Sequence, residues 1–242
     1  MKFFLSILLF CIVNNSGDVP IGAQKLIKAY PDKISHYKDN KLFFKDGSSM
    51  VYDDRKQKKD AELLDNPDIE DQFKWQYETL GMNDAGRIRN EAFFKKMYGN
   101  SKEEVAKKLI EIIWCPKLVN QKIKVTTVNG VDKAIQKISK ELDQHANLKP
   151  YLSNIGGTFH WRKIAGTNRL STHSFGMTID INTKFSNYWQ WDCRCTDETR
   201  KLKHKNKIPQ VIVDVFKKNG FIWGGNWYHY DTMHFEYRPE LL

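Results

Sequence analysis

The sequence lacks long apolar runs, flexible linkers and internal repeats. Beyond residue 13, no segment is long and apolar enough to span a bilayer. The 242 residues include only seven prolines and 14 glycines, and no stretch is rich in either. Hydrophobic residues make up 40% of the chain and aromatic residues 13%, which excludes a disordered protein. We therefore expect one substantial domain with a well-buried core.

The strongest local motifs for zinc and for nucleic acid are also missing. The chain has no HExxH helix and no CxxC pair. Its formal net charge is +10, but the lysines are scattered and form no basic-aromatic repeat, so we expect no nucleic-acid partner. The excess charge suits another polyanion. We interpret the densest basic run, residues 201–207, as a solvated loop, with a polymer-binding patch as the alternative.

The first residues predict export. Lys2 precedes an apolar run that ends at Val13 and is followed by polar residues. Such a run is too short to cross a bilayer comfortably and is typical of a secretory signal peptide, which we place at 1–17. We expect a secreted or periplasmic protein without a stable membrane anchor. An uncleaved anchor is the alternative, and Phe10 before Cys11 argues against a lipoprotein.

Three cysteines remain beyond this leader: Cys115, Cys193 and Cys195. An odd number allows one disulfide and one free thiol. Because Cys193 and Cys195 flank a single residue, that spacing is poorly suited to a bridge between them. We therefore expect a bond from Cys115 to one of the two. A second metal site that uses Cys193 and Cys195 is a weaker alternative.

Hydrophobic periodicity predicts an α+β fold, with a small, largely antiparallel sheet and helices packed on one face. We expect helices at 101–115, opened by a Ser101–Glu104 capping box, at 131–142 and at 208–218. We expect strands at 122–128, 177–182, 221–223 and 234–238, and a hairpin within 43–52 that turns at Asp46-Gly47. Residues 18–95 are interpreted as an N-terminal extension packed on a main domain at 96–242.

One motif carries the chemistry: Ser171-Thr-His-Ser-Phe-Gly-Met-Thr-Ile-Asp180, followed later by Asp231-Thr-Met-His234. Its two imidazoles and one carboxylate, His173, Asp180 and His234, make a three-ligand zinc set that leaves a position open for water. The alternation over 177–182 would turn Met177, Ile179 and Ile181 to the core and Asp180 to a cleft. On a straight strand, Asp231 and His234 would point to opposite faces, so we place Asp231 on a loop.

This motif resembles that of the M15 zinc peptidases, the D-alanyl-D-alanine carboxypeptidases and L-alanyl-D-glutamate endopeptidases of peptidoglycan. Their pattern is S-x-H-x-x-G-x-A-x-D, then D/E-x-x-H. Thr178 stands here in place of the usual alanine and is small enough to fit. Further segments resemble the flanks of one bacterial subgroup, so that the likeness covers most of the chain beyond the leader and is tightest over 156–240; these segments are 84–89, 93–99, 156–166 and 223–227.

The resemblance implies an M15-like fold and a role for each motif residue. His173, Asp180 and His234 would bind Zn²⁺, Asp231 would be the catalytic acid/base, and Arg162 would stabilise the oxyanion. Glu236, two residues after His234, is an alternative acid/base or a residue that orients a ligand. We expect substrate contacts from Ser171, His160 and Trp223. No base stands at a triad spacing from Ser171, so we interpret it as a hydrogen-bond partner that supports the zinc site and not as a nucleophile.

The implied function is a secreted zinc metallopeptidase that hydrolyses peptidoglycan stem peptides with zinc-activated water. The sequence leaves open whether the D-Ala-D-Ala or the L-Ala-D-Glu bond is cut, and it does not determine the oligomeric state. The alternative is a non-catalytic, zinc-containing module that binds cell wall or peptide. An amidase that cuts between sugar and peptide would differ from the peptidase only in its substrate.

Overall fold

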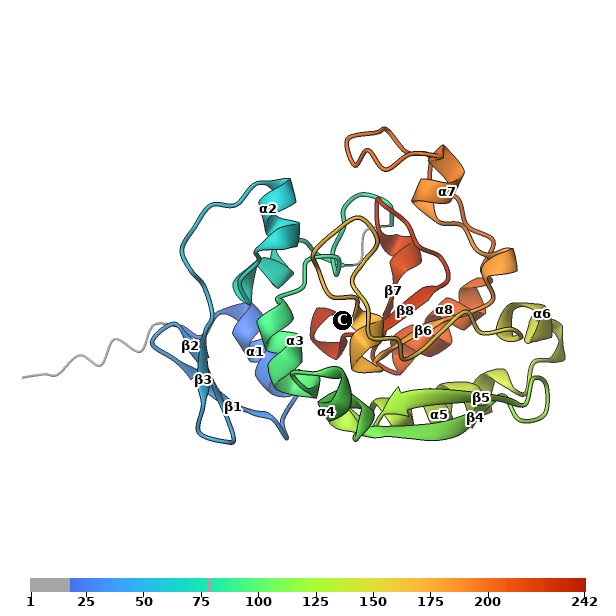
Figure 1. Ribbon diagram of the computed structural model, residues 1–242, viewed down its shortest axis with the longest axis horizontal. Helices are drawn as coiled ribbons and strands as arrows, with labels where there is room; N and C mark the ends of the chain where they lie inside the picture. Colours follow the sequence, from blue (N-terminus) through green and yellow to red (C-terminus); the bar gives the residue numbers. More distant parts are fainter. Residues whose placement is uncertain (1–17, 78–79) are drawn as a thin grey trace, which may run out of the picture.

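The computed structural model describes residues 18–77 and 80–242, so the leader predicted at 1–17 lies outside the described residues. Figure 1 shows α1, α2 and the first sheet on one side of the molecule and the sheet β6–β8–β7 on the other, with β4, β5 and α5 along the bottom. Within the described ranges, no helix has the length and apolar character needed to cross a membrane. The chain forms both helices and small antiparallel sheets, which confirms the predicted α+β class.

The N-terminal part holds α1 (Ile21–Ala29), the three-stranded antiparallel sheet and α2 (Asp60–Asp65). The sheet consists of β1 (Ile34–Lys38), β2 (Lys41–Phe44) and β3 (Ser49–Val51). The predicted hairpin is confirmed: Phe43 pairs with Ser49, and Gly47 turns the chain at a φ of 85°. The Tyr30 hydroxyl at the end of α1 donates to Glu240, 2.5 Å away at the other end of the chain. Residues of both parts belong to one hydrophobic core; the division at residue 95 stays a prediction.

The middle of the chain corrects one prediction. The helix expected at 101–115 ends early, because α4 covers only Lys102–Ala106 and is followed by the strand β4 (Leu109–Trp114). Ser101 does cap α4, since its Oγ accepts the Glu104 N–H at 3.2 Å. The strand then pairs antiparallel with β5 (Gln121–Thr126), and Ile112 opposite Ile123 faces the core. Three β-branched isoleucines suit this pleated surface better than a helix.

The remaining helices support the two sheets. They are α3 (Glu91–Tyr98), α5 (Val131–Leu142), α6 (Lys149–Leu152), α7 (Trp189–Cys193) and α8 (Gln210–Lys218). The ranges predicted for α5 and α8 are thereby confirmed to within two residues. Buried residues of α5, among them Ile135 and Ile138, belong to the same core as Ile112 and Ile123 of β4 and β5. Phe216 of α8 stacks on Phe235 with 3.9 Å between the ring centroids, which covers one face of the C-terminal sheet.

The C-terminal sheet has the order β6–β8–β7 and is antiparallel throughout. Its strands are β6 (Thr178–Asp180), β7 (Phe221–Trp223) and β8 (His234–Tyr237). Met177, Ile179 and Ile181 are fully buried, as the alternation predicted. In the register between β6 and β8, Asp180 lies directly opposite His234. This pairing brings two of the predicted metal ligands together at one end of the sheet.

The expected disulfide is wrong. Cys193 and Cys195 are bonded to each other, and Cys115 is a free, buried thiol. Arg194 between them adopts a left-handed conformation with a φ of 53°, and the resulting turn brings the two Cα atoms to 5.2 Å. That separation lies within the range for disulfides. Because both sulfurs are used, the alternative of a metal site at this pair is excluded as well.

Candidate metal centre

The structure brings the three predicted ligands together. His173 lies in the short 3₁₀ helix Thr172–Phe175, Asp180 ends β6, and His234 begins β8. The carboxylate of Asp180 bridges the two rings: its Oδ2 is 3.1 Å from His173 Nε2 and its Oδ1 is 3.1 Å from His234 Nδ1. One ligand atom from each residue lies within 4.8 Å of the others. Such a compact set of two imidazoles and a carboxylate has the composition and the spacing of a metal site.

Local structure explains how His173 is placed. The Ser171 Oγ accepts the backbone N–H of His173 and so caps the 3₁₀ helix at its start. Gly176 ends that helix in a left-handed conformation with a φ of 66°. A Cβ at this glycine would lie 2.6 Å from the Leu109 side chain and 3.2 Å from the Thr126 backbone nitrogen. Both the turn and the close approach of β5 therefore require glycine here.

Gly176→Ala is therefore expected to destabilise the protein more than Gly130→Ala. Gly130 also has a positive φ, 74°, but a Cβ there would meet no atom within 4 Å. Backbone strain of about 1–3 kcal/mol applies to both substitutions. The steric conflict with Leu109 and Thr126 adds to it only at residue 176. Denaturant unfolding of both variants measures the difference, and equal losses would contradict a packing requirement at Gly176.

Both imidazoles are oriented by a second hydrogen bond. His173 Nδ1 is 2.7 Å from the Thr158 carbonyl oxygen, so that this nitrogen donates and Nε2 is left as the metal-facing lone pair. His234 Nε2 lies 3.2 Å from the Glu236 carboxylate, which leaves Nδ1 facing Asp180. Ligand histidines in metal sites are commonly held in this way, because the outer bond fixes tautomer and ring orientation. This arrangement supports the assignment of both rings as ligands.

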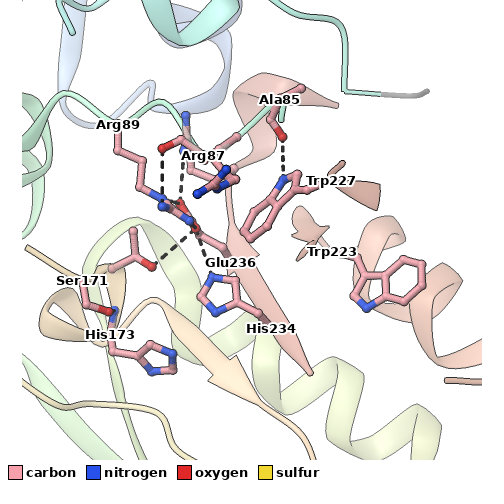
Figure 2. A network of polar contacts seen from close by, with 12 residues as sticks. Ala85, Arg87, Arg89, Ser171, His173, Trp223, Trp227, His234 and Glu236 are labelled. Carbon is pink, nitrogen blue, oxygen red and sulfur yellow. Dashed lines mark hydrogen bonds and ion pairs between the residues drawn. The ribbon is translucent and has the colours of Figure 1, made fainter. Parts of the chain in front are cut away.

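Glu236 is completely buried between two arginines. Arg89 donates to it from Nε and Nη2, with the shortest contact at 2.6 Å, and Arg238 Nη1 lies 3.1 Å away. Burial opposes ionisation, but the charges of Arg89 and Arg238 and the bond from His234 lower the pKa of Glu236 well below its usual range. In Figure 2 the carboxylate lies between Arg89 and His234. This favours the interpretation that Glu236 orients a ligand over the alternative that it is the acid/base.

Asp231 lies beside the ligands on a loop, as predicted from its spacing to His234. Its backbone N–H donates to the Gly224 carbonyl at 2.9 Å, and its backbone pairs with Tyr188, so the loop is held on both sides. The side-chain Oδ1 is buried and has no hydrogen-bond partner among the described residues. Burial, with the negative charge of Asp180, raises the pKa of Asp231 to about 6. A free acceptor oxygen with a pKa near neutrality suits proton transfer.

Three other predicted residues form no side-chain hydrogen bond with the three ligand residues within the described part of the chain. Arg162 is exposed, and its guanidinium donates to the Lys163 carbonyl at 3.4 Å. His160 is also exposed and contacts the site through its backbone: its N–H donates to the His173 carbonyl, and its carbonyl accepts the Ser174 hydroxyl. Trp223 is buried, and its indole N–H donates to the Thr232 carbonyl at 2.9 Å, so it belongs to the core; its role as a substrate contact stays a prediction. The roles of Arg162 and His160 stay predictions.

A second group of carboxylates has a different composition. Asp54, Asp68 and Asp71 surround the buried ammonium group of Lys58, with N–O distances of 3.0, 3.1 and 2.6 Å. The lysine therefore supplies the positive charge that these acids need. Among the residues that the structure describes, the group of His173, Asp180 and His234 is the one that combines histidine with carboxylate in a metal-sized cluster.

Sequence reasoning did not identify Arg89 as part of this site. The pair of Arg89 and Glu236 is separated by 147 positions. The segment 84–89 drew attention only through its resemblance to other sequences, and no local spacing connects it to the final strand. Thr158, whose carbonyl orients His173, is likewise joined to the site only by the folded backbone.

Comparison with known proteins adds one match. Residues 165–237 match a family model of the M15 type that is described as D-alanyl-D-alanine carboxypeptidase. This segment contains His173, Asp180, Asp231, His234 and Glu236 and does not extend to Arg89 or Arg162. No curated protein matches the chain, and no solved structure matches it.

Proposed function

We propose that the chain, whose residues 165–237 match the family model of M15 D-alanyl-D-alanine carboxypeptidases, is a zinc-dependent hydrolase of peptide bonds in peptidoglycan stem peptides. The observation that carries the proposal is the cluster of His173, Asp180 and His234 with the carboxylate of Asp231 beside it, whose Oδ1 has no hydrogen-bond partner among the described residues. Ligands and proton acceptor thus lie within one site. The net charge of +10 is consistent with an anionic wall polymer as substrate.

The donor set fits zinc. Two imidazole nitrogens and a carboxylate oxygen are ligands that zinc accepts, and three protein ligands leave one tetrahedral position open. When bound, the metal would make water acidic and polarise a peptide carbonyl. The outer bonds from Thr158 and Glu236 keep the two rings ready to bind.

Two residues of the chain would then act directly in hydrolysis: Asp231 in proton transfer and Arg162 in stabilising the oxyanion. Asp231 takes a proton from the attacking water through its free Oδ1 and returns it to the leaving amine. Its loop is held by Gly224 and Tyr188, which limits movement of that carboxylate. Arg162 is the proposed donor to the oxyanion, since a guanidinium is always charged and carries several N–H groups. Its backbone is fixed next to the ligand turn, because its carbonyl accepts the Ser171 N–H at 2.9 Å.

Glu236→Gln is expected to weaken zinc binding about tenfold to hundredfold, which is the usual effect of losing an outer partner of a ligand histidine. The neutral amide no longer balances Arg89 and Arg238, and it holds His234 less firmly. Competition with a chelating dye measures the affinity. Glu111→Gln, which removes only an exposed pair with Lys122, is the matched control. Unchanged affinity in folded Glu236→Gln protein would contradict the orienting role.

The direct test of the proposed function is incubation of the purified protein with defined muropeptides, with zinc and with chelator, followed by mass spectrometry. Zinc-dependent loss of terminal D-Ala would identify a carboxypeptidase. Release of L-Ala from the rest of the stem would identify an endopeptidase. No cleavage by folded protein that carries one zinc per chain would overturn the proposal and favour the binding module. The predicted leader, which would export the protein to this substrate, remains part of the proposal.

A further inference from the structure

A cavity of about 1230 Å³ lies next to the metal centre, between the N-terminal part and the segment that leads to His173. Thr172, the neighbour of His173, lines it, and so does Arg89, the partner of Glu236. Two further arginines, Arg87 and Arg169, line the same cavity. Figure 2 shows Arg87 and Arg89 on the side of Glu236 away from His173. The cavity is thus near the site but contains none of the three ligands.

Two of these three guanidinium groups donate hydrogen bonds to carboxylates. Arg89 binds the buried Glu236 through two nitrogens. Arg87 donates to Asp84 at 3.1 Å and to Glu198 at 2.8 Å. The positive charges of Arg87 and Arg89 are therefore both balanced by carboxylates of the protein.

Arg169 is different. Its Nε is buried and has no hydrogen-bond partner within the described part of the chain. The closest carboxylate oxygen, on Asp65, is 3.4 Å from Nε and belongs to a side chain that is 59% exposed. Burial, together with the positive charges of Arg87 and Arg89, lowers the pKa of Arg169. Since arginine nevertheless stays protonated, its charge is paired with the exposed Asp65, while its buried Nε donates no hydrogen bond within the described residues.

The other acids of the cavity do not supply what Arg169 lacks. Glu91 pairs with Lys95 at 2.6 Å and accepts the backbone N–H of Leu170. Asp84 is shared between Arg87 and His229. The backbone of Arg169 is also fixed, because its carbonyl accepts the Ile164 N–H at 2.9 Å. A guanidinium on a fixed backbone that lines a cavity large enough for a ligand, and that is paired only with an exposed carboxylate among the described residues, has the chemistry of an anion subsite.

We infer that Arg169 binds a carboxylate group of the substrate in this cavity. The inference rests on the proposed function, since a stem peptide carries carboxylates at its C-terminus and on its D-Glu residue. A planar guanidinium can hold such a group through two parallel hydrogen bonds. The subsite would hold one part of the peptide while another part reaches the metal centre.

Kinetics on paired substrates test the inference. Stem pentapeptides with either carboxylate replaced in turn by a carboxamide are compared with the free acid. Arg169→Gln is expected to lower kcat/KM for the free acid about tenfold to hundredfold, as for a lost hydrogen bond to a charged group. It should change kcat/KM little for the one amide that lacks the recognised carboxylate. Arg169→Lys should recover part of the loss, and the exposed Arg55→Gln, outside the cavity, is the control. Equal losses on all three peptides, or no loss, would overturn the inference.

A binding measurement separates this inference from the proposed function. If the wild-type protein cleaves none of the peptides, the proposed function fails, and calorimetry still tests the subsite. The probe is the tripeptide L-Ala-γ-D-Glu-L-Lys, added to the zinc-loaded Asp231→Ala variant with and without Arg169→Gln. Binding that is weakened about tenfold or more by Arg169→Gln supports the anion subsite. Equal binding by both proteins, or binding by neither, overturns it.

Discussion

Replacing His173 with alanine is expected to remove both zinc binding and hydrolysis. His173 is one of three donors, and the substitution leaves only Asp180 and His234. Loss of the metal removes several kcal/mol of transition-state stabilisation, so kcat/KM should fall about a thousandfold or more. Zinc content after gel filtration, measured by mass spectrometry, and hydrolysis of muropeptides are the two readouts.

His160→Ala is the matched control for this substitution. His160 lies in the same segment but is exposed, and only its backbone contacts His173. The control variant should keep zinc at one ion per chain. If folded His173→Ala protein also retained stoichiometric zinc at wild-type affinity, the ligand set proposed here would be wrong.

Replacing Asp231 with asparagine is expected to separate chemistry from metal binding. Zinc content should stay the same, because the three donors do not include Asp231. Turnover should fall about 100- to 10,000-fold, the usual contribution of a general acid/base. The fold should tolerate the change, since the buried Oδ1 has no hydrogen-bond partner among the described residues to lose.

Two outcomes would contradict this assignment. Loss of zinc in Asp231→Asn would show that the carboxylate is itself a ligand. Full turnover with zinc retained would show that another group moves the proton. Asp214→Asn, on the exposed side of α8, controls for a general effect of the substitution. Comparison with Glu236→Gln separates the two carboxylates, because only the latter change should act through zinc affinity.

The local sequence pattern was sufficient to predict structure where residues close in sequence determine it. The alternation predicted that Met177, Ile179 and Ile181 face the core, and all three are buried. The strand is more than half-buried, however, because Thr178 and Asn182 on the other face are buried as well. The three-residue spacing of Asp231 and His234 predicted a loop before the last strand, and β8 begins at His234. In both cases the strand period of two residues determines which side chains share a face.

The local sequence pattern gave the wrong secondary structure where pairing with a distant segment determines it. The apolar residues Val105, Leu109, Ile112 and Ile113 also fit a helical stripe, and the capping box at Ser101 is formed. Pairing with β5 nevertheless makes a strand of Leu109–Trp114, because Ile112 gains a buried partner in Ile123. The disulfide was missed for a different reason: the left-handed turn at Arg194 is a backbone conformation that the spacing of two cysteines does not reveal.

By itself, the sequence determined the chemical inventory of the site: two imidazoles and a carboxylate with a second carboxylate nearby, and a glycine at residue 176 for the tight turn. Only the tertiary structure decided which atoms meet. His234 and Asp180 are 54 positions apart, and Arg89 and Glu236 are 147 apart. Side-chain type is a property of each residue, whereas these contacts depend on the register of β6 against β8 and on how the N-terminal part packs against them. That packing also left Arg169 in a cavity with a buried donor unsatisfied.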